Sequence, residues 1–495
     1  MPPVRRLLPL LGLVVACQTP PPATVTDGAV HDAHGGADRP PGHDAGPGTD
    51  ARASDAGGRD AGSPDGGGPD GPRDAGFNLL GPPLVFAPTA SSFGLNAVVR
   101  DGDPATLQLQ VRREADGGWS VEDPPSLPAP DVAQWRVSGL PRATRVPYRL
   151  VRADDADPLY IGTAPTTPPP GTPFTFAMIT DTHLNPRDPL LEGTTVGIDF
   201  YGEMEQTMLD VMSQVSAIGA DFVINLGDLL DYHALGQFNG PAPDVHWARL
   251  AYLNYRRLLG DTTANAAHFE VIGNWEGESG CDPPDAIARS TTQRLIYSPG
   301  PSPTTYAEGG SGNQDYYAFT WGDALFVVLN VMTYTPTCHL LDYDPGLPDD
   351  WTLGADQLAW LQRTLAGATS KWRFLFIHHT VGGAAGDPAD TAYGRGGGQA
   401  AHVGEQAQIH AMMLQYGVQV FFYAHDHVFT DMVVDGIHYA LPGSAGAPWK
   451  FDDSQTGYTQ SWPDSGYARA RVTPEKVQVD FVSITGQTLY GFALP

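Results

Sequence analysis

Residues 221–231 read DFVINLGDLLD, in which an apolar run ends at a turn that carries two acidic side chains. Residues 221–226 have the composition of a buried strand, and Gly227 allows the chain to turn sharply behind it. Asp228 follows at once, so its carboxylate is expected at the carboxyl end of the strand. In an α/β sheet this edge is where ligands bind. The stretch therefore predicts a strand that delivers a carboxylate to a site.

The same pattern, an apolar run followed by a polar turn, occurs four more times. The runs span residues 174–180, 268–272, 372–377 and 418–423. The turns behind them are Asp181-Thr182-His183, Gly273-Asn274, His378-His379 and Ala424-His425-Asp426-His427. Because the carboxyl ends of parallel strands meet at one edge of a sheet, we expect the five turns to converge in space.

Helical patterns separate these runs. Residues 203–218, 356–368 and 404–416 carry apolar side chains at helical spacing, and residues 324–330 form one more buried run. Strands that alternate with helices predict a layered α/β fold. After Val433 the strand-like segments return, at residues 467–472 and 476–484.

The side chains in the turns are those that bind transition metals. Carboxylates, amide oxygens and imidazoles suit Zn, Mn and Fe ions. Two ions roughly 3.5–4 Å apart can clamp a phosphoryl group and activate a water between them. A carboxylate can bridge such a pair, and Asp228 is the natural bridge.

The order D-x-H, G-D-x-x-D, G-N-x-E, H and x-H-x-H over residues 174–445 resembles that of the calcineurin-like metallophosphoesterases. The resemblance implies a four-layer α/β/β/α sandwich that hydrolyses phosphate esters with two Fe, Zn or Mn ions and a metal-bound hydroxide. It implies one metal on Asp181, His183, Asp228 and His427. It implies a second metal on Asp228, Asn274, His378 and His425, with Glu276 orienting the amide ligand.

Trp275 departs from the family pattern, because the family usually has a His here that contacts substrate and protonates the leaving group. An indole has no titratable proton near neutral pH and cannot serve as that acid. Two interpretations stay open. Trp275 either forms an apolar or stacking wall at the substrate mouth, or packs as a loop aromatic on the preceding domain.

A second departure concerns iron. Purple acid phosphatases have a Tyr ligand where this chain has Asp231, so we do not expect a tyrosinate–iron site. The same enzymes carry a catalytic His in a loop that corresponds to the Gly-rich loop before residue 404. His402 is therefore the candidate acid and Arg395 the candidate phosphate contact, with solvated surface residues as the alternative. Asp426, between two ligands, is expected to support them.

The first 17 residues predict export. Arg5 and Arg6 precede a short apolar run, and Val14-Val15-Ala16-Cys17 resembles a bacterial lipobox, in which Cys17 is lipidated. We expect an exported protein held by this lipid at the cell envelope, in the outer membrane or periplasm. A plain secretory signal with an incidental Cys is the alternative. Residues 18–76 are rich in Asp, Ala, Gly and Pro and predict a disordered acidic linker.

Residues 77–168 predict a small all-β domain, because short alternating segments are separated by turn residues. The stretch from Trp135 to Tyr148 resembles the later strands of a fibronectin type III domain, which precedes the catalytic domain in purple acid phosphatases. The Pro-rich residues 163–173 read as a stiff linker, and the catalytic domain is expected over residues 174–495.

Charge and cysteines limit the possible partners. A net charge of −28 repels nucleic acid, so none is expected to bind, and phosphate chemistry would need bound metal. In an oxidising compartment Cys281 and Cys338 either pair or stay free. The expected substrate is a small phosphate ester. A phosphodiesterase acting on nucleotide or lipid head-group diesters and a non-catalytic metal-binding surface lipoprotein are the alternatives. The sequence does not indicate an oligomeric state.

Overall fold

The computed structural model describes residues 77–114, 117–184, 203–230, 245–280, 282–335, 352–379, 403–448, 450, 458 and 460–495. All of them belong to one compact unit, Asp65–Pro495. The predicted signal segment, the linker, both remaining cysteines of the possible disulfide and most of the Gly-rich loop lie outside the described residues. Within the described chain, no helix is long and apolar enough to cross a membrane.

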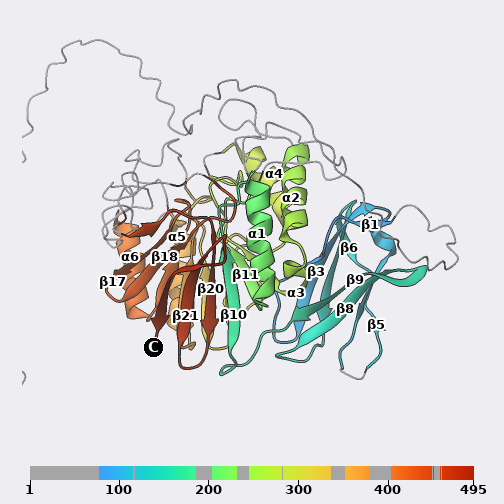
Figure 1. Cartoon of the computed structure of the whole chain (residues 1–495), viewed down its shortest axis with the longest axis horizontal. Helices are drawn as coiled ribbons and strands as arrows, with labels where there is room; N and C mark the ends of the chain where they lie inside the picture. Colours follow the sequence, from blue (N-terminus) through green and yellow to red (C-terminus); the bar gives the residue numbers. More distant parts are fainter. Residues whose placement is uncertain are drawn as a thin grey trace, which may run out of the picture. The chain divides into compact units, whose positions relative to one another are not determined.

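The largest sheet has eleven strands in the order β22-β21-β20-β10-β11-β12-β2-β3-β7-β6, with β1 paired to β3 (Figure 1). Its central strands β10, β11 and β12 are parallel. The strands are β1 (Asn78–Leu79), β2 (Leu84–Phe86), β3 (Ser92–Asp101), β6 (Ser126–Ala129), β7 (Val132–Ser138), β10 (Phe174–Ile179), β11 (Phe222–Asn225), β12 (Ala267–Glu270), β20 (Gly466–Val472), β21 (Val477–Ser483) and β22 (Thr488–Leu494).

The second sheet has seven strands in the order β13-β14-β15-β16-β18-β17-β19, of which β14, β15 and β16 are parallel. They are β13 (Tyr317–Trp321), β14 (Ala324–Val328), β15 (Trp372–Phe376), β16 (Val420–Phe422), β17 (Phe429–Val434), β18 (Ile437–Pro442) and β19 (Ser461–Trp462). The apolar runs that the sequence predicts as strands are found in these two sheets, as β10, β11 and β12 in the first and as β14, β15 and β16 in the second.

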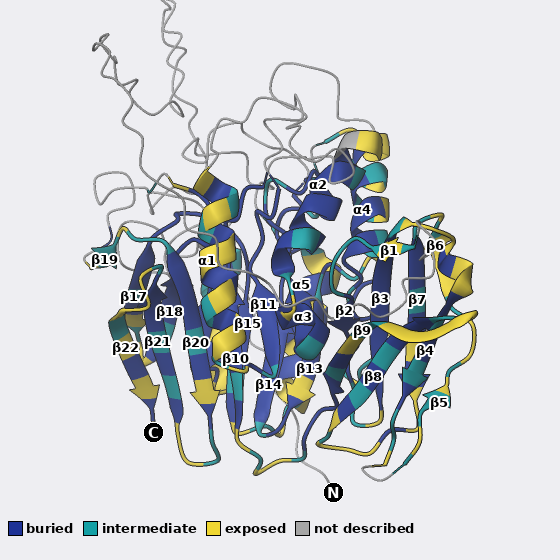
Figure 2. Ribbon diagram, turned by 45° about the vertical axis from the view of Figure 1, so that its right-hand side comes forward, coloured by how far each residue is buried: buried dark blue, intermediate teal, exposed yellow. Residues whose placement is uncertain are grey.

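The inner faces of these two sheets pack on each other through aromatic side chains. Phe176 of β10 meets Phe326 of β14 edge-on, with ring centroids 5.2 Å apart, and Phe269 of β12 stacks on Phe319 of β13 at 4.0 Å. Figure 2 shows the central strands β11 and β15 in the colour of buried residues. Strands β11, β14 and β16 are buried at every position. Because such strands are covered on both faces, their sequences are nearly continuous apolar runs, which is why they are readable from the sequence.

Helices cover the outer faces. On the larger sheet, α1 packs Met208 and Val211 against Ile179 and Val223. On the other sheet, Leu361 of α5 packs in one cluster with Leu375 and Phe421. The helices are α1 (Glu203–Ala217), α2 (Val245–Leu259), α3 (Thr262–Asn265), α4 (Pro284–Tyr297), α5 (Gly354–Gly367) and α6 (Val403–Gln415). The layers are therefore α/β/β/α, which confirms the predicted fold class.

A third sheet of four strands, in the order β5-β4-β8-β9, packs on the first strands of the large sheet. It contains β4 (Leu107–Val111), β5 (Ser120–Val121), β8 (Arg145–Arg152) and β9 (Asp155–Pro165), and the 3-10 helix η1 (Pro104–Thr106) precedes β4. Phe93 of β3 and Tyr148 of β8 lie in the shared core with ring centroids 6.3 Å apart. A separate fibronectin type III domain stays a prediction.

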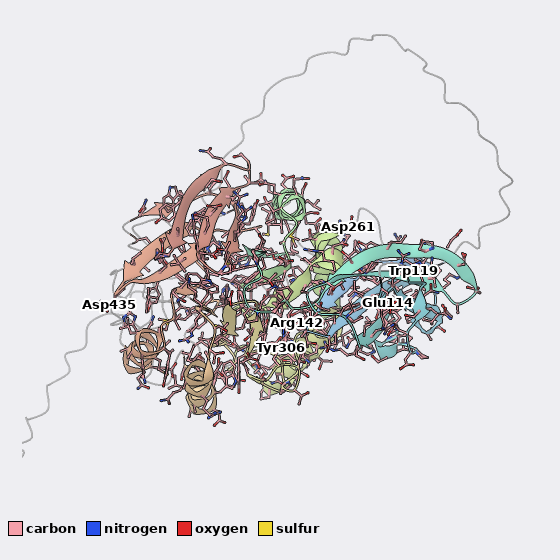
Figure 3. All side chains as sticks on the ribbon, turned by 90° about the horizontal axis from the view of Figure 1, so that it is seen from below. Glu114, Trp119, Arg142, Asp261, Tyr306 and Asp435 are labelled. Carbon is pink, nitrogen blue, oxygen red and sulfur yellow. The ribbon has the colours of Figure 1, made fainter. Side chains whose placement is uncertain are left out.

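Backbone and side-chain bonds join the strands before β10 to the α/β/β/α layers. Strand β2 pairs in parallel with β12, so one sheet runs through both regions. The Tyr160 hydroxyl donates to Asp261 at 2.7 Å, and the Tyr306 hydroxyl donates to the Pro88 carbonyl at 2.8 Å; Figure 3 labels Asp261 and Tyr306. The β2–β12 pairing carries no sequence signal, because a three-residue strand is too short to show its partner.

Helices α2 and α4 were not among the predicted elements. The buried face of α4 is partly polar and includes Ser290, Gln293 and Arg294, so it lacks the apolar stripe that marks a helix. The Arg294 guanidinium instead forms a buried ion pair with Glu278, with Nε 2.6 Å from Oε1 and Nη2 3.0 Å from Oε2. This pair fixes α4 to the chain that follows β12.

Replacing Arg294 by Met should destabilise the protein by about 3–5 kcal/mol, because it leaves the Glu278 carboxylate buried and unpaired. The matched control is Arg289→Ala on the same helix, whose partner Asp285 is 74% exposed, and no measurable change is expected there. Urea unfolding of both variants provides the comparison. Equal stability of Arg294→Met and the wild type would show that α4 is held by other contacts.

Candidate metal centre

The polar turns behind β10, β11, β12, β15 and β16 lie together at the carboxyl ends of these strands. The first two turns run side by side: the Asp181 N–H donates to the Gly227 carbonyl at 3.0 Å, and the His183 N–H donates to the Asp228 carbonyl at 2.9 Å. Strands β10, β11 and β12 belong to the larger sheet, and β15 and β16 belong to the other. The site therefore draws its side chains from both sheets.

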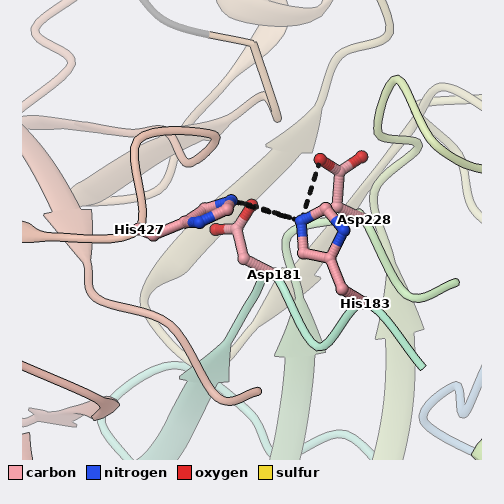
Figure 4. A group of neighbouring side chains, drawn as sticks. All are labelled: Asp181, His183, Asp228 and His427. Carbon is pink, nitrogen blue, oxygen red and sulfur yellow. Dashed lines mark hydrogen bonds and ion pairs between the residues drawn. The ribbon is translucent and has the colours of Figure 1, made fainter. Parts of the chain in front are cut away.

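A first group of ligand-type side chains consists of Asp181, His183, Asp228 and His427 (Figure 4). One atom of each lies within 4.8 Å of the others, and all four side chains are buried. His183 Nε2 is 3.5 Å from Asp228 Oδ2 and 3.2 Å from His427 Nε2. His427 Nε2 is 3.4 Å from Asp181 Oδ1. Two carboxylates and two imidazoles thus face one point.

A second group shares Asp228 and adds His378 and His425. His378 Nε2 lies 3.1 Å from Asp228 Oδ2, and the Asn274 amide lies 3.0 Å from His378 Nε2 and 2.8 Å from His425 Nδ1. The Nδ1–H of His378 donates to the Leu226 carbonyl at 2.8 Å. That bond fixes the ring and turns Nε2 toward the group, as is usual for a histidine ligand.

The chemistry of these side chains fits a cation in each group. Asp181 is fully buried, yet neither of its carboxylate oxygens accepts a hydrogen bond from a described residue. A buried carboxylate of this kind needs positive charge beside it. The nitrogen and oxygen atoms offered by the two groups are those that Mn, Fe and Zn prefer.

Glu276 holds the turn that carries Asp228. Its buried carboxylate accepts the backbone N–H groups of Asp228 at 3.3 Å and Leu229 at 2.5 Å, and that of Gly273 as well. Asp228 is thus positioned by a neighbouring turn. Glu276 also holds the backbone of Gly273, which precedes Asn274, and its predicted role in orienting the Asn274 amide stays a prediction.

Two glycines allow the turns to approach this closely. A Cβ on Gly273 would lie 2.2 Å from Asp228 Oδ1, and a Cβ on Gly227 would lie 2.6 Å from the Gly273 nitrogen. Both distances are far inside van der Waals contact. The G-D and G-N motifs therefore need glycine because a side chain would not fit there, as well as because glycine allows the sharp turn.

The backbone at the site is unusual. Nine non-glycine residues in the described chain have positive φ, and five of them are candidate ligands: Asp181, His183, Asp228, His425 and His427, with φ between 45° and 80°. Each left-handed residue costs roughly 1–2 kcal/mol, and such strain gathers at functional sites. The turns are bent so that consecutive ligands can point to one place.

Charge is unevenly distributed over the imidazoles. Burial lowers the pKa of His183 to about 3, so this ring is neutral and ready to bind a cation. Burial also opposes a charge on His378, but the adjacent Asp228 carboxylate outweighs it and raises the pKa to about 10. Burial alone would raise the pKa of Asp181; the imidazoles of His427, His378 and His183 outweigh it and hold that pKa below its ordinary value.

Other residues singled out in the sequence lie close by. The Trp275 ring meets His183 edge-on at 5.1 Å, and its backbone N–H donates to Asp228 Oδ1 at 2.9 Å. Asp426 is buried and accepts the Tyr458 hydroxyl at 2.7 Å. His379 lies against His425, with ring centroids 4.6 Å apart. The interpretation of Trp275 as a residue at the site is thus favoured over packing on the preceding domain.

His402 and Arg395 lie outside the described residues, as do Asp231 and the cysteine pair. The predicted roles of His402 as acid and Arg395 as phosphate contact stay predictions. The role of Asp426 also stays a prediction.

Lys450 was missed in the sequence. Its ammonium donates to the Ala447 carbonyl and to the hydroxyls of Ser444 at 3.3 Å and Ser465 at 3.1 Å. The Ala447 N–H in turn donates to the Asp181 carbonyl at 2.9 Å. Burial lowers the Lys450 pKa to about 8, and the Asp181 charge partly opposes this. The only feature of the sequence that could have drawn attention to Lys450 is that lysine is rare in this chain, which has three lysines.

Comparison with known proteins places the site in a family context. A sequence model of the calcineurin-like phosphoesterases matches residues 174–429. Tartrate-resistant acid phosphatase type 5 of Oryctolagus cuniculus is 24% identical over 186 residues, which are 35% of this chain. The match spans about half of that relative, 52% of its length.

Comparison with solved structures gives the following matches. The structure of PhoD superposes with a TM-score of 0.62 and 14% identity, over 86% of this chain and 91% of PhoD. A dimetal phosphatase from Danio rerio gives a TM-score of 0.43 with 14% identity, over 65% of this chain and 99% of that protein. At these identities the likeness to PhoD shows the fold.

Replacing Gly273 by Ala should destabilise the protein by about 1–3 kcal/mol, because the added methyl displaces Asp228 or its turn. Gly312→Ala is the matched control, since a Cβ there meets nothing within 4 Å. Its stability should stay the same or rise slightly. Urea unfolding of the two variants side by side is the measurement. A Gly273→Ala variant as stable as Gly312→Ala would contradict the close approach of the two turns.

Proposed function

The chain belongs to the calcineurin-like phosphoesterase family, and from that premise we propose that it hydrolyses phosphate esters at a centre of two metal ions. The observation that carries the proposal is the sharing of Asp228 between two groups of buried ligand-type side chains. Asp181, His183 and His427 complete the first position, and Asn274, His378 and His425 complete the second. Fe, Zn and Mn are the ions that suit these donors.

When bound, such ions supply a nucleophilic water and positive charge for the phosphoryl oxygens. The residues of the chain hold the geometry. Two hydrogen bonds fix Asp228 in place. The Trp275 backbone N–H donates to Asp228 Oδ1, and the Asp228 backbone N–H donates to the Glu276 carboxylate. His378 is fixed by the Leu226 carbonyl. A preorganised site of this kind needs little rearrangement during the reaction.

Trp275 favours one group of substrates. Its indole stands at the site where the resembling enzymes place an acid, and it has no proton to give near neutral pH. Esters whose leaving group departs without protonation are therefore the preferred substrates. The second candidate function, hydrolysis of nucleotide or lipid head-group phosphodiesters, fits the absence of this acid if the leaving group needs little protonation, so aryl and alkyl diesters are the compounds to compare.

Replacing Asp228 by Asn should remove most of the activity and at least one bound metal. The purified protein is analysed for metal, and turnover of a chromogenic phosphate monoester and diester is followed with added Mn or Zn. Asp154→Asn, at a surface ion pair in the β8–β9 turn, is the control and should behave as the wild type. Full metal content and normal turnover in Asp228→Asn would contradict the proposal. Metal binding without turnover in the wild type would favour a non-catalytic metal-binding lipoprotein.

We also propose, from the sequence, that the protein is exported and held at the cell envelope by a lipid on Cys17. Cys17→Ser should then move the protein from the membrane fraction to the soluble fraction. Mass spectrometry of the mature N-terminus is the direct measurement. A mature chain that retains residues 1–16 without a lipid would contradict this proposal.

A further inference from the structure

The Asn274 side-chain amide lies between the second ligand group and the Trp275 indole. One end of the amide is 2.8 Å from His425 Nδ1, 3.0 Å from His378 Nε2 and 3.2 Å from Asp228 Oδ2. The other end is 3.1 Å from Trp275 Nε1. The oxygen and the NH₂ of an amide occupy nearly the same space, so the hydrogen-bond partners decide which end carries which atom.

In one orientation the Asn274 oxygen faces the ligand group, which is the orientation that can bind a cation. Its NH₂ then faces the Trp275 Nε1–H, and the two donors oppose each other at 3.1 Å. In the turned orientation the NH₂ donates to His425 Nδ1 at 2.8 Å and to Asp228 Oδ2 at 3.2 Å, and the oxygen accepts from the indole. Every polar atom of the amide is then satisfied, but no oxygen is offered to a cation.

We infer that Trp275 weakens cation binding at the second position by stabilising the turned orientation of Asn274. The inference rests on the proposed two-metal function. A cation that enters between Asp228, His378 and His425 must turn the amide and break its bond to the indole. Among the described residues the first group contains no amide, and it offers two carboxylates where the second offers one.

The two positions therefore differ in affinity for a divalent cation. The first holds its ion tightly, and the second exchanges its ion with the solution. Activity then follows the free concentration of the metal, so the centre responds to the metal supply around the protein. At position 275, where the family usually has a His, this chain has a residue that cannot protonate the leaving group but that acts on the metal centre.

The test is a titration of the chelator-treated full chain with Mn²⁺, read by isothermal calorimetry and equilibrium dialysis. The wild type should bind two ions with separate dissociation constants. Trp275→Phe keeps an aromatic ring against His183 but removes the N–H. The weaker dissociation constant should fall about tenfold, which corresponds to about 1.4 kcal/mol, and the tighter one should stay the same.

Trp360→Phe is the matched control, because that indole also donates a hydrogen bond, to the Glu308 carbonyl at 2.9 Å, away from the ligands. It should leave both constants unchanged. Asn274→Asp provides a second test, since a carboxylate offers oxygen at both ends and accepts the indole N–H without turning. On that background Trp275→Phe should no longer tighten the weaker constant.

Each outcome decides a different claim. An unchanged or raised weaker constant in Trp275→Phe overturns the inference, as does the same tightening on the Asn274→Asp background. Two equal constants in the wild type also overturn it. The wild type is also titrated with Zn²⁺ and Fe²⁺. Failure to bind any of the three ions would overturn the proposed function itself, and this result is distinguishable because it does not depend on Trp275.

Discussion

The position of the Asp228 carboxylate is the constraint on which the site depends. Both ligand groups use it, and its Oδ2 lies 3.5 Å from His183 Nε2 and 3.1 Å from His378 Nε2. A carboxylate this deeply buried is stable only where donors or cations surround it. Here the Trp275 backbone N–H donates to Oδ1, and the Glu276 carboxylate accepts the backbone N–H of Asp228. A shift of this one side chain would disturb both groups together.

The surrounding layers keep the strained turns in place. Five candidate ligands have left-handed backbones, and an isolated turn would relax to relieve them. The strands in front of the turns cannot follow such a relaxation, because their side chains interlock between the two sheets, as Phe176 does with Phe326. The rigidity of the aromatic core and the strain at the site are thus two parts of one arrangement. The glycines at 227 and 273 have no room for a side chain for the same reason.

The sequence predicts what depends on local pattern. Buried strands covered on both faces appear as apolar runs, and the polar residues behind them identify the edge where the candidate ligands meet. Features that depend on partners far along the chain were not readable. Helix α4 has a partly polar buried face around Arg294, and the β2–β12 pairing joins two short strands. Lys450 reaches the Asp181 turn through the Ala447 peptide, a geometry that no spacing in the sequence reveals. The relation of Trp275 to the Asn274 amide depends on distances of a few tenths of an ångström.

The ligand-type side chains are divided between the two sheets in a way that links metal binding to folding. The larger sheet supplies every carboxylate and the amide, and the seven-stranded sheet supplies only imidazoles, from His378, His425 and His427. Each group contains members from both sheets, so a cation in either position ties one sheet to the other. A ligand that binds only the folded chain stabilises it in proportion to the logarithm of its concentration over its dissociation constant. In the proposed two-metal centre, an ion held tightly at the first position would add to the aromatic packing between the sheets. An ion at the second position would contribute less, because the Trp275 indole competes for Asn274.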